Sequence, residues 1–157
     1  MNLLRNTTII ITITAALLGA GIATAQEKKI KRSDLPPAVE KTVVVESSAA
    51  TILGFSQEKE NGQTFYEAEM KINGHTRDIL IDATGAIVEV EEEVALDALS
   101  PQVKAGLTAK AGQGKILKVE SIKKHDKLVA YEAQVSTNGK RSEVQIGPDG
   151  KPLDHEE

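Results

Sequence analysis

The clearest pattern along the chain is the alternation of apolar and polar residues in its middle. Over residues 63–72 the apolar positions are Tyr66, Ala68, Met70 and Ile72, and Glu67, Glu69 and Lys71 lie between them. Successive side chains of a β-strand point to opposite faces, so the pattern predicts a strand with one solvated face. The same alternation recurs around Tyr131. Both tyrosines fall at apolar positions, which favours packing in the core over contact with a ligand.

Turn residues divide the alternating segments into predicted strands. Asn-Gly pairs at 61–62, 73–74 and 138–139 are typical of two-residue hairpin turns, because both residues tolerate a positive φ. The predicted strands cover 51–60, 63–72, 75–82 and 86–92 in the first half of the chain, and 115–124, 127–136, 140–146 and 151–154 in the second. Strands joined by short hairpins are antiparallel, so each half predicts an antiparallel meander.

A helical spacing precedes each set of strands. Leu99, Val103, Leu107 and Ala111 recur every four residues and therefore share one face of a predicted helix. Ser100 is suited to cap its first turn, and Pro101 to the first helical position. The first half repeats the spacing with Leu35, Val39 and Val43, although the β-branched run 43–45 lowers its helix propensity.

The two halves also resemble each other in sequence. Leu35-Pro36-Pro37-Ala38-Val39 recurs as Leu99-Ser100-Pro101-Gln102-Val103, and Tyr66-Glu67-Ala68 recurs as Tyr131-Glu132-Ala133. These matches keep their order, which indicates one unit written twice. We therefore predict an α+β fold of two tandem helix-plus-antiparallel-meander repeats, 34–94 and 95–157, with the helices packed on one face of the sheet or sheets. Each half is marginal for a core of its own, so one shared eight-stranded sheet is an open alternative.

The first residues have the three parts of a secretory signal peptide. Arg5 is followed by an apolar stretch over 9–20 and by Ala23-Thr24-Ala25. We predict cleavage after Ala25, which leaves a flexible leader at 26–33 and no stable membrane anchor. The alternative is an uncleaved anchor, but threonines dilute the stretch below what a spanning helix needs. The predicted location is periplasmic or secreted.

Composition restricts the function classes. The net charge is −4 and the aromatic content 3%, which argues against a nucleic-acid partner. The chain has no cysteine, so a core of aliphatic residues has to supply the stability.

Residues for catalysis are sparse. The histidines are His75, His125 and His155, which lie in predicted turns or near the end of the chain and lack the short spacings of a zinc site. We therefore predict no enzyme activity, no catalytic residue, no metal ligand set and no cofactor.

Acidic residues form the best candidate binding site. Glu89, Glu91 and Glu93 share one face of a predicted strand, and Glu67 and Glu69 lie on the outward face of another. Carboxylates in such rows attract a basic partner or a divalent cation. The competing interpretation is a solvated face that keeps the sheet soluble and prevents edge pairing.

Both halves resemble the PepSY-like family, which is related in fold to the β-lactamase-inhibitor protein. The matching motifs are Leu-Pro-x-x-Val at 35–39, Tyr-Glu-Ala at 66–68 and 131–133, Asp-x-x-Gly at 82–85 and Pro-Asp-Gly at 148–150. The resemblance implies an exported, non-catalytic module that inhibits or modulates another extracytoplasmic protein, such as a peptidase. The alternative function is a periplasmic sensor of a small ligand or divalent cation.

Overall fold

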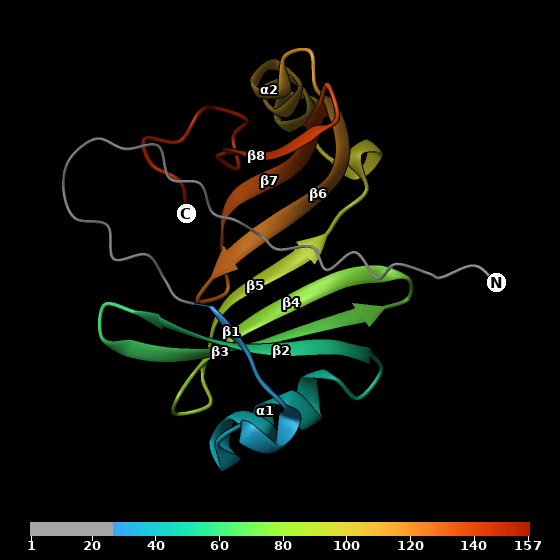
Figure 1. Ribbon diagram of the computed structural model, residues 1–157. Coiled ribbons are helices and arrows are strands. Elements are labelled where there is room, and N and C mark those ends of the chain that lie inside the picture. The colour runs from blue at the N-terminus through green and yellow to red at the C-terminus, as the bar shows by residue number, and fades with distance from the viewer. Residues whose placement is uncertain (1–26) are drawn as a thin grey trace.

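The computed structural model describes residues 27–157, so the predicted signal peptide at 1–25 lies outside the described residues. These residues form a single antiparallel sheet with the strand order β1-β2-β3-β4-β5-β6-β7-β8 (Figure 1). The strands are β1 Lys28–Lys29, β2 Thr51–Glu60, β3 Gln63–Ile72, β4 His75–Asp82, β5 Ile87–Glu93, β6 Lys115–Lys124, β7 Lys127–Thr137 and β8 Lys140–Ile146. Every strand pairs with its neighbour in sequence.

Local turn chemistry explains the hairpins. Both residues of each Asn-Gly pair have a positive φ, as do His125 and Asp126 between β6 and β7. Two-residue turns of this kind match the right-handed twist of the strands that they join. The predicted positions of strands β2, β3, β4, β6 and β8 are confirmed residue for residue, and β5 and β7 differ by one residue at their ends.

Two α-helices flank the sheet. Helix α1 spans Pro37–Glu46 and helix α2 spans Pro101–Ala111. The backbone N–H of Val103 donates a hydrogen bond to the Ser100 side chain, which caps α2 as predicted. Figure 1 shows α1 and α2 at opposite ends of the molecule, beside different parts of the sheet. Short 3-10 helices, Arg32–Asp34 and Leu96–Ala98, precede them.

The core consists of two clusters of buried residues. Val39 and Val43 of α1 are buried together with residues of β2, β3 and β4, namely Phe55, Ala68, Met70, Ile79 and Ile81. Val103 and Leu107 of α2 belong to the second cluster, with Val119, Ala133, Val135 and Ile146. Tyr66 and Tyr131 are half-buried and pack against the first and second cluster, in agreement with the predicted core role.

The predicted fold class is wrong. The described chain is largely sheet, with about half of its residues in strands and about a fifth in short helices. It is not a pair of tandem helix-plus-meander repeats, because β5 and β6 pair over five residues, Glu89–Glu93 with Glu120–Lys124, and join all strands into one sheet. Periodicity identified the elements, but this long-range pairing decides the architecture.

The two edges of the sheet differ from the prediction. Residues 151–154 form no strand, and Pro152, which lacks a backbone N–H, lies in this segment. Instead, Lys28 and Lys29 pair with Gln57 and Ser56 as β1, in a segment for which no strand was predicted. A strand of two residues is too short to show an alternation of apolar and polar positions. This strand forms because the edge of β2 offers backbone groups with which it can pair. Within 27–157, no helix has both the length and the apolar character needed to cross a bilayer.

Candidate functional site

The sheet face opposite the core clusters is rich in carboxylates. Alternation places Ala68, Ile79 and Val90 toward the first cluster, so their neighbours point to the other side of the sheet. We call this side the acidic face and define it by one set of residues from β3 to β7: Glu67, Glu69, Asp78, Glu89, Glu91, Glu93, Glu120 and Glu132.

Strand register sets carboxylates directly opposite one another. Glu69 pairs with Asp78, and Asp78 pairs with Glu91, which gives a row across β3, β4 and β5. A second row joins β5, β6 and β7, because Glu93 pairs with Glu120 and Glu120 with Glu132. Like charges at directly opposed positions of a sheet are destabilising, so both rows oppose folding when they are ionised.

The rows meet at Asp78, Glu91 and Glu120. One oxygen atom from each of these carboxylates lies within 4.8 Å of the others. Glu120 is only 3% exposed, and the other two are half-buried. Among residues 27–157, no ion pair or side-chain hydrogen bond joins Asp78 or Glu91 to another group. The trio offers three hard oxygen ligands, which is the donor type that calcium prefers, although calcium takes six to eight.

Burial and mutual repulsion shift the titration of these groups. Burial, together with the charges of Glu67, Glu120 and Glu69, raises the pKa of Asp78 to about 7. Burial raises the pKa of Glu132 to about 7 as well, where neighbouring carboxylates add to the effect. The pKa of Glu91 is raised for the same reasons, burial first and then the nearby carboxylates. The acidic face therefore holds protons near neutral pH.

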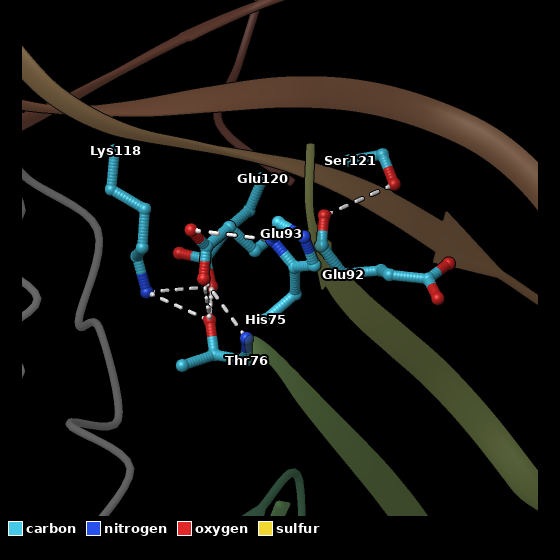
Figure 2. A network of polar contacts seen from close by, with 7 residues as sticks. All are labelled: His75, Thr76, Glu92, Glu93, Lys118, Glu120 and Ser121. Carbon is cyan, nitrogen blue, oxygen red and sulfur yellow. Dashed lines mark hydrogen bonds and ion pairs between the residues drawn. The ribbon is translucent and has the colours of Figure 1, made fainter. Parts of the chain in front are cut away.

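A polar network connects the second row to the neighbouring strand. Figure 2 shows Lys118 beside both Glu120 and Thr76, with Lys118 Nζ 2.7 Å from Glu120 Oε1. The backbone N–H of Thr76 donates a hydrogen bond to Glu93, and this bond is the main reason that the pKa of Glu93 is lowered. His75 Nδ1 lies 3.7 Å from the same carboxylate. Glu93 and Glu120 thus have partners that Asp78 and Glu91 lack.

Cations also lie at the outer parts of the acidic face. Lys29 of β1 forms an ion pair with Glu69, and Lys124 lies 3.6 Å from Glu89. The Ser56 hydroxyl donates a 2.6 Å hydrogen bond to Glu67, whose pKa is nevertheless raised by burial. At the centre of the face Lys118 pairs with Glu120, whereas Asp78 and Glu91 have no cation in ion-pair contact among residues 27–157.

The structure brings the predicted site residues onto one face. Glu67 and Glu69 lie on β3 and Glu89, Glu91 and Glu93 on β5, with β4 between them. Their role in binding stays a prediction.

Sequence reasoning missed the residues that link the two strands of the predicted site. Asp78 lies between them on β4, and its alternation with Ile79 and Ile81 was a usable signal. Glu120 and Glu132 were missed because only the pairing of β5 with β6 brings them to the same face.

The histidines are spread over the described chain. His75 begins β4, His125 lies in the turn between β6 and β7, and His155 lies in the C-terminal segment. All three are exposed. Only His75 adjoins the acidic face, through Glu93.

Comparison with known proteins identifies the fold. No protein-family model matches the sequence, and no curated protein matches it. A DUF2874 family protein of Bacteroides ovatus aligns with a TM-score of 0.58 at 21% identity, over 76% of this chain and 86% of that one. A proposed periplasmic protein of Bacteroides eggerthii aligns with a TM-score of 0.61 at 16% identity and the same coverage.

A third similar structure is described as related to the β-lactamase-inhibitor protein, BLIP. A BLIP-like protein of Bacteroides fragilis aligns with a TM-score of 0.54 at 17% identity, over 76% of this chain and 83% of that one. None of these three proteins is described as a PepSY protein, so that resemblance stays a prediction, as does the internal duplication. At this identity the likeness concerns the fold alone: the chain shares the fold of these three Bacteroides proteins, one of which is described as BLIP-like.

Proposed function

We propose that the protein is an exported, non-catalytic binding module whose acidic face engages a basic segment of another extracytoplasmic protein. One observation carries the proposal: Asp78 and Glu91 are half-buried, yet no cation among residues 27–157 forms an ion pair with either of them. Carboxylates so placed cost folding free energy, and a lysine or arginine from a partner relieves that cost.

The fold supports this kind of function. An antiparallel sheet leaves one side free of helices, and charges gathered on that side steer an oppositely charged partner. One structural neighbour is described as BLIP-like and another as a proposed periplasmic protein. An inhibitory or modulating role toward a peptidase, and periplasmic or secreted location after cleavage at Ala25, belong to this proposal.

Binding of a basic peptide tests the acidic face. A fluorescein-labelled peptide of alternating lysine and serine is titrated with the protein at low salt and pH 8, where Asp78 is mostly ionised. The double variant Asp78→Asn, Glu91→Gln should bind it roughly tenfold more weakly, because the central charge of Asp78 is lost and Glu91 can no longer ionise beside a bound lysine. Both substitutions also remove repulsion between carboxylates, so we expect the variant to remain folded.

A matched control separates this effect from net charge. Asp97→Asn removes a carboxylate from a fully exposed side chain in the 3-10 helix before α2, and Asp97 is not one of the residues that define the acidic face. Its affinity for the peptide should stay within a factor of about two of the wild type. The proposal fails if the control loses as much affinity as the double variant, or if the double variant binds as the wild type does.

A second candidate function is a divalent-cation sensor at Asp78, Glu91 and Glu120. The close approach of their three oxygen atoms favours it. Binding to the folded state raises the melting temperature at saturating cation. Calcium and zinc, each titrated alone, should then stabilise the wild type but not Glu91→Gln; equal melting temperatures with and without the metals would exclude this function.

A further inference from the structure

A small hollow with both polar and apolar lining opens beside the acidic face, where the chain leaves β5 and β6 begins. Two large apolar side chains there are unusually accessible, Leu96 at 37% and Leu117 at 43% exposed. Both line the same hollow, together with Val94, Ile116 and Val119. Apolar surface of this kind gains free energy when a partner covers it.

A β-bulge places Leu117 at the hollow. The register of β6 against β7 shifts between Ile116 and Lys118, so Leu117 is an extra residue with no partner on β7. Bulges are found next to functional sites, where they redirect a side chain. Leu53 occupies the corresponding kind of bulge in β2 and is 55% exposed, but it does not line the hollow. The two bulge leucines therefore form a matched pair.

The hollow and the acidic face are contiguous. Glu93 and Lys118 line the hollow, and both belong to the polar network that reaches Thr76 and Glu120. Figure 2 shows these side chains gathered around Thr76. Glu91 lies two residues before Glu93 on β5, which is about 7 Å along an extended strand. An apolar subsite and an anionic subsite are therefore within a few residues of each other.

We propose that the hollow receives an apolar side chain of the same partner segment whose basic residues contact the acidic face. The inference rests on the proposed function and deepens it by specifying the ligand: an extended peptide with a leucine-sized side chain within about two to four residues of a lysine or arginine. Charge complementarity supports a basic peptide as the occupant. A segment that inserts an apolar side chain into the hollow places its neighbouring residues beside the carboxylates of the acidic face, where lysine or arginine is favoured.

Two labelled heptapeptides test the inference. Each has two lysines flanking a central residue, which is leucine in one peptide and serine in the other, and glycine and serine at the remaining positions. The leucine peptide should bind the wild type roughly fivefold more tightly than the serine peptide. Leu117→Asn should abolish this preference and leave the affinity for the serine peptide unchanged, whereas Leu53→Asn should keep the preference.

Each outcome bears on one proposal or both. If the Asp78→Asn, Glu91→Gln variant loses peptide affinity but Leu117→Asn retains the leucine preference, the acidic face binds as proposed and the hollow is not a subsite. If neither peptide binds, the proposed function and this inference both fail. Sedimentation of the wild type and Leu117→Asn adds one check: a dimer that only Leu117→Asn converts to a monomer would identify a second copy as the occupant and overturn the inference.

Discussion

The free energy of unfolding should fall by about 2–4 kcal/mol as the pH rises from 5 to 8. Burial and neighbouring carboxylates raise the pKa of Asp78 from 3.8, and that of Glu132 from 4.5, to about 7 in each case. At pH values between the unfolded and the folded pKa, the folded protein holds protons on these carboxylates that the unfolded chain has released. The stabilisation by protonated Asp78 and Glu132 is complete below their unfolded pKa values and is lost as the pH rises toward 7. The raised pKa of Glu91 prolongs the loss at higher pH.

Other carboxylates set the acidic limit of this window. The pKa values of Asp82 and Glu93 are lowered, the first mainly by the Thr84 side chain and the second by the Thr76 backbone. Their contribution is lost only as the pH falls below the ordinary carboxylate range. The protein should therefore be most stable in mildly acidic solution, near pH 5.

Urea unfolding at a series of pH values measures this dependence. The double variant Asp78→Asn, Glu132→Gln should have a shallower slope between pH 5 and 8, with the remaining slope supplied by Glu91, and should be more stable than the wild type at pH 8. Asp97→Asn, whose side chain is fully exposed, should retain the wild-type slope. A free energy of unfolding that is constant or increases over this range would show that the carboxylates of the acidic face are not repelling one another.

Gly150→Ala should destabilise the protein by about 2–4 kcal/mol, through a contact that the sequence does not reveal. Gly150 lies in the turn that follows β8, with a φ of 82°, and its backbone approaches α2. A methyl group there would lie 2.4 Å from the carbonyl oxygen of Gln102 and 2.6 Å from the carbonyl carbon. Helix backbone cannot move aside as a flexible side chain can, so the turn has to shift away from α2.

Gly139→Ala provides the matched control. Gly139 has a φ of 79°, close to that of Gly150, but no atom lies within 4 Å of the position that a methyl group would occupy. Its substitution should cost about 1 kcal/mol, from the left-handed backbone conformation alone. Chemical denaturation of both variants isolates the contact with α2 as the difference between them. Equal losses would mean that the turn after β8 does not pack closely on the helix.

Much of the secondary structure was predictable because its signals are local. The alternation around Tyr66 and Tyr131 gave the faces of β3 and β7, and the Asn-Gly pairs fixed the hairpins. The spacing of Val103 and Leu107 gave the buried side of α2. Each signal depends on residues a few positions apart. The false strand at 151–154 arose where a turn was followed by a segment without real alternation.

The candidate site was predictable only in part. Alternation alone places Glu67 and Glu69 on one side of β3, and Glu89 and Glu91 on one side of β5. It does not show that Asp78 lies between the two strands, or that Glu120 approaches from β6. Contact between these carboxylates depends on the register between strands, and the alternation of residues within one strand does not specify that register.

By itself, the sequence determined where the strands and helices lie and which side of most strands is polar. A period of two residues in a strand, or of about four in a helix, can be recognised from residues only a few positions apart. Only the tertiary structure decided that β5 pairs with β6, that one sheet replaces two repeats, and that the bulge at Leu117 adjoins the acidic face. The physical reason is that pairing between distant strands is chosen by the packing of the whole chain, and the same local alternation is compatible with several pairings.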